Sequence, residues 1–478
     1  MNIERRAPHR PATDPTGPTG RLATWLSELA LEDVPQRVHE RAKHLILDGI
    51  GCAIVGAQLP WSRQAVEIVT RLEGEGGHSL IGWNRKTSAP AAALLNGTFI
   101  QGFELDDYHP RAPLHSASLV LPALLACIEH RSVSGARALQ AVIAGFEVGP
   151  RVGLALHGGE MLSRGWHSGA VFGTHASAAT AGTLLGLDAA GFEDALGLAA
   201  TQSAGLMAAQ YEAMSKRMHH GFSARNGLYA AHLAAGGYTG IKRVFEREYG
   251  GFLSTFGEGH APDAAQIADG LGERWETECI VVKPYAAMGG LHAPLDALFE
   301  IGAKRTLRAG EIERIEIDLS HAVFHHGWWV LERPLTPIAA QMNIAYAIAV
   351  ALIDGEAMLR QFAPQRIDQD DVWELIPRIV ARHDPSFDAA GPLSRGRTRL
   401  RIVFRDGTVL EAERQASRAA LQPLSNDEVV AKYRHLSKAL VEGARRSEIE
   451  RAVLSLDELP DAGRLIELLA PEVGAAFE

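Results

Sequence analysis

Cysteine is scarce in this sequence. The 478 residues include three cysteines, Cys52, Cys127 and Cys279, which stand far apart and each in apolar surroundings. Ligands of zinc or of iron–sulfur clusters occur as closely spaced cysteines, and a disulfide framework needs an even number of them. The pattern therefore argues against both and favours reduced, buried thiols in a cytoplasmic protein.

A surplus of positive charge is also missing. The chain has 47 lysines and arginines against 57 acidic residues, a formal net charge of -10, which argues against nucleic acid or an anionic membrane as a partner. No apolar stretch reaches membrane-spanning length without a charge or a histidine. Residues 1–20 are rich in proline and glycine and lack the apolar run of a secretory signal, so we expect a disordered arm.

What the sequence does contain is enough apolar residues for a large core. The hydrophobic content is 46% and the charged content 22%, which is typical of a globular protein. Apolar and small residues recur at helical spacing and predict a series of buried helices in the first half of the chain, among them 35–56, 89–99, 119–129 and 136–156.

The composition changes after about residue 275. Residues 312–319 alternate as a strand, and two further strands, 399–405 and 408–413, flank Asp406-Gly407, a strong hairpin signal. A helix is expected at 370–382, and helices return after residue 426. These features predict a smaller α+β unit within a mainly helical protein, and no internal repeat is visible.

Ionisable residues concentrate in one segment, 102–118, between two of the predicted buried helices. It holds three carboxylates, two histidines and an arginine: Glu104, Asp106, Asp107, His109, His115 and Arg111. Pro110 and Pro113 interrupt any helix here, and Ser116 is placed to cap the helix that follows. Burying such a loop is costly unless it is paired or functional. We interpret it as a functional loop, the alternative being a solvated connection between helices.

Two more segments carry candidate site residues. A glycine-rich segment, 165–177, places His167 immediately before a helix start, where backbone N–H groups and the helix dipole attract anions. A basic segment, 214–227, contains Lys216, Arg217, His219 and His220 without interleaved acids and leads into an alanine-rich helix. A structural histidine and a solvated charged face are the alternatives, but we expect the basic segment to provide the counter-charge for an anionic ligand.

Taken in order, these segments resemble the MmgE/PrpD family, which contains 2-methylcitrate dehydratase, cis-aconitate decarboxylase and iminodisuccinate epimerase. The matching landmarks are Leu95-Asn-Gly97, Asp106-Asp107 with His115, Gly145-Phe-Glu-Val148, Trp166-His167, Ser215-Lys-Arg-Met-His219 and Lys283-Pro-Tyr285. The resemblance extends from about residue 22 to about residue 440. The ordered series is much more specific than any one of its motifs.

The resemblance implies a mainly α fold, with a large all-α helical domain built from both chain ends and a smaller inserted α+β lid domain. With the change in composition, it predicts a helical domain over 21–278 and 415–478 and a lid over 279–414. Members of the family are similar in being homodimers that need neither a metal nor an organic cofactor. Their active sites lie between the helical domain and the lid.

Residue roles can be carried over position by position. The core site residues of the family match two histidines and a lysine of this chain, His115, His167 and Lys216. Lys283 matches a lysine at the start of the lid. In contrast, Glu104 stands where the decarboxylase branch has aspartate, and Met288 stands where it has a histidine, for which His292 is a candidate substitute. These departures weaken a specific assignment as a decarboxylase.

The residue types suit proton transfer beside carboxylates. Histidines can take and give protons near neutral pH, and lysines can hold substrate carboxylates and developing negative charge. Which histidine is the acid and which the base stays open. We predict catalytic roles for His115, His167, Lys216, Glu104 and Asp106, and substrate contacts for Asp107, Tyr108, His219, Lys283 and His292.

The leading interpretation is a cofactor-free lyase that dehydrates a 2-methylcitrate-like hydroxy acid. The close alternative, which uses the same groups, is decarboxylation of cis-aconitate or epimerisation of an imino- or amino-dicarboxylate. A different class is a metal-dependent hydrolase using Asp106, Asp107, His109, His115 and His167, although the basic segment around Lys216 would repel a cation. A non-catalytic carboxylate-binding relative is a third possibility, against which the presence of His115 and Lys216 counts.

Overall fold

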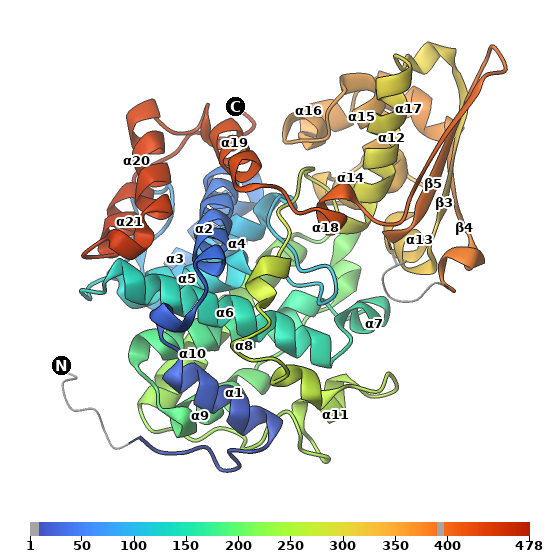
Figure 1. The fold of residues 1–478 in the computed structure, drawn as a ribbon. Coiled ribbons are helices and arrows are strands. Elements are labelled where there is room, and N and C mark those ends of the chain that lie inside the picture. The colour runs from blue at the N-terminus through green and yellow to red at the C-terminus, as the bar shows by residue number, and fades with distance from the viewer. Residues whose placement is uncertain (1–8, 390–395) are drawn as a thin grey trace.

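The computed structural model describes residues 9–389 and 396–478. The protein is mainly α-helical, as predicted (Figure 1). Its first part contains α1 (Pro18–Glu28), α2 (Gln36–Ala57), α3 (Pro60–Glu73), α4 (Ala89–Ile100), α5 (Ala117–Ile128), α6 (Gly135–Ala155), α7 (Gly158–Ser163), α8 (Ser168–Leu185), α9 (Ala189–Ala200), α10 (His219–Ala235) and α11 (Phe252–Phe256). The middle contains α12 (His292–Lys304), α13 (His321–Gly327), α14 (Pro337–Met342), α15 (Ile344–Asp354), α16 (Pro364–Ile367) and α17 (Asp370–Leu375). The last part contains α18 (Arg418–Leu421), α19 (Asn426–Ser437), α20 (Gly443–Leu454) and α21 (Gly463–Leu469).

Helix α8 lies at the centre of the helical part and packs against α5, α6, α9 and α10. It is rich in glycine and alanine, so its neighbours approach closely, and its residues from Ser168 to Leu184 are buried. Helix α10 packs equally closely on α4, where a Cβ atom on Gly221 would overlap the carbonyl oxygen of Leu94. These contacts bring the end of α4 and the starts of α8 and α10 together, which are the places where the candidate residues occur.

The strands form a small hairpin and one larger sheet. Strands β1 (His78–Ser79) and β2 (Lys86–Thr87) pair with each other, and the larger sheet has the order β4-β3-β5-β6. Strands β3 (Ile312–Leu319) and β5 (Thr398–Phe404) are antiparallel, as are β5 and β6 (Val409–Arg414). The hairpin predicted around Asp406-Gly407 is confirmed. Helix α12 packs against β5 and β6, and α15 packs against β4 (Figure 1).

The fourth strand of this sheet, β4 (Ile379–His383), corrects the helix expected at 370–382. The helix α17 ends at Leu375, and after a 3-10 turn the chain pairs in parallel with β3, with Ile315 opposite Ile379. Pro377 lies in that turn, where its ring prevents an uninterrupted helix. Alternate residues of β4 are buried, as is usual in a strand. In the sequence, this five-residue alternation is too short to be recognised next to the helical pattern of the preceding residues.

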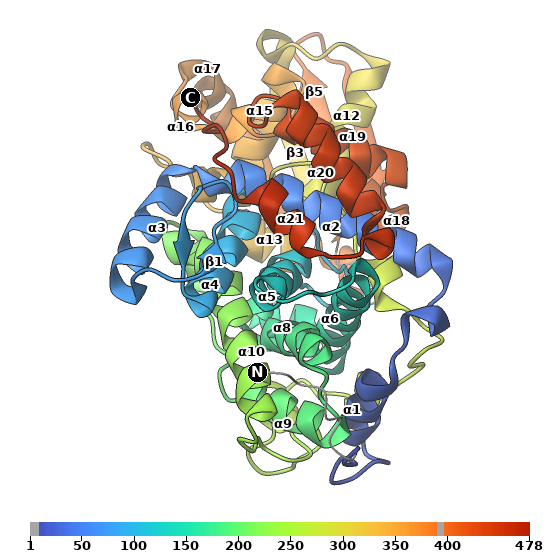
Figure 2. The same ribbon diagram turned by 90° about the vertical axis from the view of Figure 1, so that its left-hand side faces the viewer.

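The two ends of the chain meet at α2. Helix α19 packs against α2, and Figures 1 and 2 show α19, α20 and α21 beside it. A buried ion pair joins the two helices, with Lys432 Nζ 2.6 Å from Asp48 Oδ1. Apolar residues of both helices, including Ile50 and Leu436, belong to one continuous core.

The structure differs from the arm expected at residues 1–20. Residues 1–8 lie outside the described part of the chain, but from residue 9 on the backbone is packed against the helical part. Arg10 forms an ion pair with Asp188 at the start of α9, and Thr13 donates two hydrogen bonds to Glu193. Helix α1 already begins at Pro18, a residue type whose fixed φ suits the first turn.

Two further expectations concern the membrane and the cysteines. Within the described ranges, no single helix has both the length and the apolar composition of a membrane span; α2 and α3 reach them only as a pair, and they meet at an angle of 84°. The three cysteines are unpaired, as predicted. Cys52 and Cys127 are buried, while Cys279 is partly exposed.

Candidate active site

The loop between α4 and α5 is fixed at several points. It leaves α4 through a 3-10 turn, Gln101–Phe103, after which Glu104 adopts a left-handed conformation with φ of 54°. Such a backbone costs free energy in a residue other than glycine and is kept where the surroundings demand it. The N–H and C=O groups of Tyr108 both bond to Val281, each at 2.8 Å. The loop is therefore held beside the chain segment that carries Lys283.

Glu104 lies between two lysines. Its Oε1 accepts a hydrogen bond from Lys216, and its Oε2 accepts one from Lys283 at 3.0 Å; all three side chains are buried. Burial by itself raises the pKa of Glu104, but the two ammonium groups hold this pKa well below its ordinary value. We call these three residues the lysine clamp. With one carboxylate and two ammonium groups it carries a net charge of +1, which suits it to an anionic ligand.

The predicted pair of Asp106 and His115 is present. Asp106 Oδ1 lies 3.3 Å from Nδ1 of His115, and the buried carboxylate has no well-aligned hydrogen bond among the described residues. An imidazole next to a buried carboxylate is oriented by it, and its protonated form is stabilised. The side chain of His115 is 17% exposed. It therefore combines a buried counter-charge with access to solvent.

Four histidines form a cluster beside the lysine clamp: His115, His167, His219 and His220. The ring of His167 lies 4.4 Å from that of His219 and 5.2 Å from that of His220, centroid to centroid, and His220 lies 5.1 Å from His115. We call this group the histidine cluster. His167 precedes the first residue of α8, whereas His219 and His220 begin α10.

Burial and mutual repulsion keep the deeper members of the histidine cluster neutral. Burial, followed by the nearby His219 and His220, lowers the pKa of His167 well below its ordinary value. Burial and Lys216 lower the pKa of His219 to about 4, and burial lowers that of His220 well below its ordinary value. Neutral imidazoles beside a positively charged clamp can accept protons when an anion arrives.

Comparison with known proteins identifies the family. Models of the MmgE/PrpD N-terminal domain and the MmgE/PrpD C-terminal domain match residues 20–264 and 285–458. The chain belongs to the MmgE/PrpD family. Cis-aconitate decarboxylase-like protein oryM of Aspergillus oryzae is 45% identical over 95% of this chain and 98% of its own length. Cis-aconitate decarboxylase of Aspergillus terreus is 43% identical over 95% of this chain and 96% of its own length, and that of Homo sapiens is 25% identical over 96% of each.

The structure brings together most of the residues that the MmgE/PrpD resemblance implied. The lysine clamp and the histidine cluster are neighbours, because Glu104 interacts electrostatically with His115, and Lys216 with His167. They come from the loop after α4, the starts of α8 and α10, and the segment before α12. The predicted residues that meet here are Glu104, Asp106, His115, His167, Lys216, His219 and Lys283.

Both carboxylate oxygens of Asp107 accept hydrogen bonds from the backbone, so they are not free for the predicted contact with substrate. Its two carboxylate oxygens accept the backbone N–H groups of Ser116 and Ala117 at 2.9 and 3.0 Å. It therefore caps α5, a role expected of Ser116, whose side chain forms no capping hydrogen bond. Burial and the neighbouring Asp106 raise the pKa of Asp107 to about 8.

Tyr108 and His292 lie near the lysine clamp but outside the histidine cluster. The hydroxyl of Tyr108 is 3.3 Å from Ser417 Oγ, and its ring is 6.2 Å from that of His292. Nε2 of His292 lies 3.1 Å from the carbonyl oxygen of Ala287, and burial with Lys283 nearby lowers the pKa of His292 to about 3. Both thus lie beside the chain segment that carries Lys283, and their contact with substrate stays a prediction.

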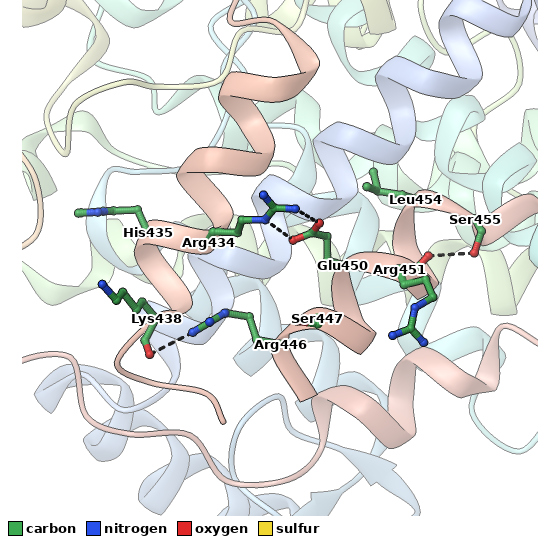
Figure 3. Close-up of a pocket in the computed structure, with 9 residues that line it drawn as sticks. All are labelled: Arg434, His435, Lys438, Arg446, Ser447, Glu450, Arg451, Leu454 and Ser455. Carbon is green, nitrogen blue, oxygen red and sulfur yellow. Dashed lines mark hydrogen bonds and ion pairs between the residues drawn. The ribbon is translucent and has the colours of Figure 1, made fainter. Parts of the chain in front are cut away.

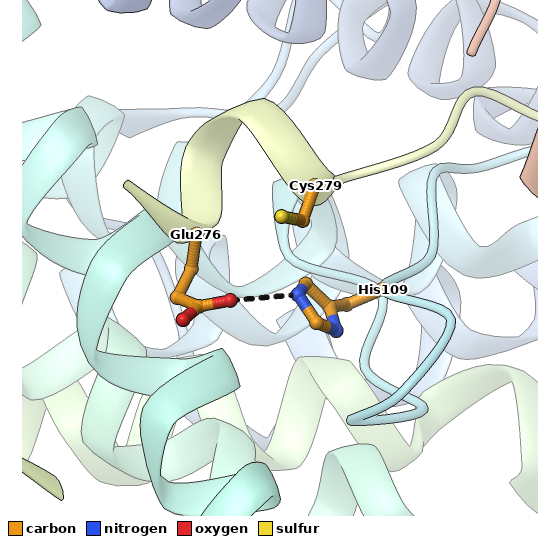
Figure 4. A group of neighbouring side chains, drawn as sticks. All are labelled: His109, Glu276 and Cys279. Atoms are coloured by element: carbon orange, nitrogen blue, oxygen red, sulfur yellow. Dashed lines mark hydrogen bonds and ion pairs between the residues drawn. The ribbon is translucent and has the colours of Figure 1, made fainter. Parts of the chain in front are cut away.

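A metal site built on His109 is not supported by its hydrogen bonds. In the part of the chain that the structure describes, one group of possible ligands meets, His109, Glu276 and Cys279 (Figure 4). Nδ1 of His109 accepts the N–H of Ala112 at 3.0 Å, so Nε2 donates to Glu276 at 3.1 Å. Both ring nitrogens are used, and neither offers a lone pair to a cation. This removes His109 from the metal-dependent alternative.

Two residues of the site region were missed at the level of sequence. His220 lies in the histidine cluster. The sequence analysis named it as part of the basic segment, but nothing in its type or position marked it as a site residue. Gln341 of α14 is fully buried; it donates to the carbonyl groups of Phe103 and Ala286 at 2.7 and 2.9 Å and accepts from Arg217 at 3.0 Å. A lone glutamine has no sequence signal, so only its position reveals that it joins the two parts of the chain.

A surface pocket of about 750 Å³ lies elsewhere, between α19 and α20 (Figure 3). Its lining is mostly basic and includes Arg434, Lys438, Arg446 and Arg451, with Glu450 paired to Arg434 at 2.5 Å. None of the predicted site residues lines it. The candidate active site is instead the buried group around the lysine clamp, which is closed in this structure apart from the exposed edge of His115.

Proposed function

We propose that this chain is a decarboxylase of cis-aconitate or of a very similar unsaturated tricarboxylate, and that it works without a metal or an organic cofactor. The observation that carries the proposal is the buried lysine clamp next to the histidine cluster. The relatives that are 43% and 45% identical over 95% of the chain are named as a cis-aconitate decarboxylase and a protein like it. They favour this reaction over the dehydration of 2-methylcitrate that the sequence pattern placed first.

The two departures from the decarboxylase pattern, Glu104 and Met288, are compatible with a decarboxylase once their surroundings are known. Glu104 has one more methylene than aspartate, and its carboxylate reaches both Lys216 and Lys283. Met288 is partly exposed and packs on the core, while His292 is buried nearby. The carboxylate of Glu104 therefore joins two cations in spite of the longer side chain.

The lysine clamp supports substrate binding. Each ammonium group has three N–H donors, so Lys216 and Lys283 retain donors beyond their bonds to Glu104. A tricarboxylate brings three negative charges to a clamp with a net charge of +1. Its arrival therefore favours protonation of His167 and His219, whose pKa values burial lowers in the free chain.

The chemical step needs one bond broken and one proton delivered. The bond between carbon and one carboxylate breaks, carbon dioxide leaves, and the bonding pair stays on the carbon framework, where the double bond and the remaining carboxylates spread the charge. A proton added to carbon then gives an unsaturated dicarboxylate with one carbon fewer. The lysine clamp stabilises the charge that is left behind.

Among the histidines, His115 is best placed to deliver this proton. Asp106 lies 3.3 Å from its Nδ1 and orients the ring, and its exposed edge allows a new proton to be taken from solvent after each turnover. His167 is neutral in the free chain and becomes charged with the substrate bound, when its Nε2–H can pair with a substrate carboxylate. Dehydration and epimerisation would use the same two imidazoles, which is why the sequence alone does not separate them.

We further propose that residues 279–414 act as a lid over this site. Lys283 belongs to that segment, whereas Glu104 and Lys216 belong to the helical part. Gln341 lies at the junction and forms hydrogen bonds to both sides. Opening would break the bonds of Gln341 to Phe103 and Arg217 and part Lys283 from Glu104, which admits substrate. Closing would exclude water and strengthen every charge interaction inside.

Incubation of the purified protein with candidate substrates tests the proposal. Cis-aconitate, citrate, 2-methylcitrate and iminodisuccinate should be supplied separately, with products followed by NMR. We expect release of carbon dioxide and one new olefinic product from cis-aconitate. A Lys216→Ala variant is the control for a contaminating enzyme. Turnover of 2-methylcitrate without turnover of cis-aconitate would overturn the proposal.

A further inference from the structure

His220 has hydrogen bonds that define its tautomer. Its Nδ1 lies 2.8 Å from Ser118 Oγ, and the same hydroxyl donates to the carbonyl oxygen of His115 at 3.0 Å. A serine hydroxyl has one hydrogen, and the carbonyl group of His115 cannot donate. With that hydrogen directed to the carbonyl group, Ser118 accepts from Nδ1 of His220, and Nε2 of His220 carries the lone pair.

The lone pair on Nε2 has no hydrogen-bond partner in the described structure, although the atom is buried. A buried acceptor without a donor is costly and calls for a functional explanation. Nε2 lies against the first turn of α8, where a Cβ atom on Gly169 would overlap it. The residue before this helix is His167, whose ring is 5.2 Å from that of His220.

His167 offers the matching group. Its Nδ1 is likewise buried without a partner. Unpaired nitrogens thus occur in neighbouring rings of the cluster, Nδ1 of His219 among them. With its proton on Nδ1, His220 offers an Nε2 that accepts. Catalytic hydrogen bonds are often long before substrate binds and tighten in the complex.

We propose that His220, fixed by Ser118, is a positioning residue that accepts the Nδ1–H of His167. The inference rests on the proposed function, because it concerns the proton that His167 takes up with the substrate. If Nδ1 of His167 always keeps its hydrogen, the exchanging proton must be the one on Nε2. Asp106 directs His115 in the same way from its own Nδ1. Each of the two working imidazoles then turns Nε2 to the substrate.

The groups around His220 favour this neutral, accepting role. His115, Lys216 and His219 are the nearby groups that oppose a positive charge on it, and Glu104 is the one that favours it. Burial adds to the opposition. A protonated His220 would lose the lone pair, and it would also place a third cation beside Lys216.

The first test measures tautomers and needs no substrate. Side-chain ¹⁵N NMR of the free protein, with assignments from His→Gln variants, distinguishes Nδ1–H from Nε2–H imidazoles. We expect His220 and His167 both in the Nδ1–H form. Finding His220 in the Nε2–H form would overturn the inference, whatever the protein turns over. Correct tautomers without turnover of cis-aconitate would instead refute only the proposed function.

The second test uses enzyme kinetics to distinguish the roles of Nδ1 and Nε2 of His220. His220→Gln places an amide oxygen near the position of Nε2, whereas His220→Asn keeps a donor for Ser118 but loses the acceptor. We expect His220→Asn to lower kcat on the order of 10²-fold and to shift the acidic limb of its pH profile, while His220→Gln keeps more of the activity. Equal kcat and equal pH profiles for His220→Asn and the parent would refute the inference.

Ser118→Ala provides the test if substitutions of the buried His220 do not fold. It removes one oxygen, releases Nδ1, and should allow His220 to change to the Nε2–H form, with a fall in kcat and little change in KM. His232→Asn, at an exposed position on the same helix, is the matched control. A Ser118→Ala variant with unchanged tautomers and unchanged kcat would overturn the proposed role of the pair.

Discussion

Replacing Glu104 with glutamine probes the charge balance of the lysine clamp. Glutamine keeps the shape of the side chain but removes its charge and turns an amide N–H₂ group toward one of the two ammonium groups. Lys216 and Lys283 form their ion pairs with Glu104 alone among the described residues. They would remain as two buried cations without a contacting counter-charge. Breaking a buried pair in this way costs about 3–5 kcal/mol.

This cost converts into a measurable change in melting temperature. An unfolding entropy of about 2.1 cal/mol/K per residue, taken over 478 residues, is about 1 kcal/mol/K. For unfolding in one cooperative step, the melting temperature should then fall by about 3–5 °C. A Glu278→Gln variant, which loses a partly exposed pair with Arg37, is the control, with an expected change of about 0–1 kcal/mol.

Stability should rise with pH in both proteins, but over different pH ranges. In the parent, the pKa of Glu104 is lowered by folding, so its contribution is fully present above the ordinary value of 4.5 and is lost as the pH falls below it. In Glu104→Gln, the buried ammonium groups gain by releasing protons. The unfolded chain then binds more protons than the folded one, and the stability of the variant should rise with pH.

Calorimetric or fluorescence melts between pH 3 and pH 9, with and without cis-aconitate, would show both effects. A bound carboxylate supplies the missing negative charge, so the ligand should raise the melting temperature more in Glu104→Gln than in the parent, while kcat falls. A variant that melts within 1 °C of the parent, with the same pH dependence, would refute the reasoning about the lysine clamp.

Three further predictions follow from the same site. His115→Ala and His167→Ala should each lower kcat by about 10²–10⁴-fold with little change in melting temperature; near-normal kcat in either variant would make that histidine structural. Exhaustive chelation should leave turnover unchanged, because lysines occupy the place where a cation would bind; activity that is lost and then restored by one metal would contradict this. Lys283→Ala should raise KM and lower kcat together, and a saturating tricarboxylate should protect residues 283–292 from hydrogen exchange. Unchanged exchange there would contradict lid closure.

Regular patterns allowed much of the fold to be predicted. The strand at 312–319, the hairpin at Gly407 and the buried helices follow from apolar periodicity and turn chemistry, which act locally. The expected helix at 370–382 was wrong beyond Leu375, because a short edge strand depends on pairing with β3. The cap of α5 was also assigned to the wrong residue. Ser116 is adjacent in sequence, but Asp107 reaches the N–H groups of Ser116 and Ala117 from across the loop, and local propensity contains no such information.

The sequence predicted which residues form the candidate site, but not the contacts between them. Lysines and histidines in basic or glycine-rich segments indicated Lys216 and His167, and the family resemblance added Lys283. Nothing in the sequence showed that Glu104 bonds to both lysines, or that Ser118 determines the tautomer of His220. Such relations depend on how α4, α5, α8 and α10 meet, which is a property of the packed chain.

The ion pair between Asp48 and Lys432 has a consequence for biosynthesis. Lys432 also donates to the carbonyl oxygen of Leu105 at 2.7 Å, so a residue of α19 supports the loop between Glu104 and Asp106. During translation, the segments that carry His115, His167 and Lys216 leave the ribosome long before α19 does. A nascent chain can therefore form its central helices while the loop still lacks this support. Activity should emerge only with the final helices, and a ribosome stalled before residue 432 should hold a chain with folded central helices and no activity.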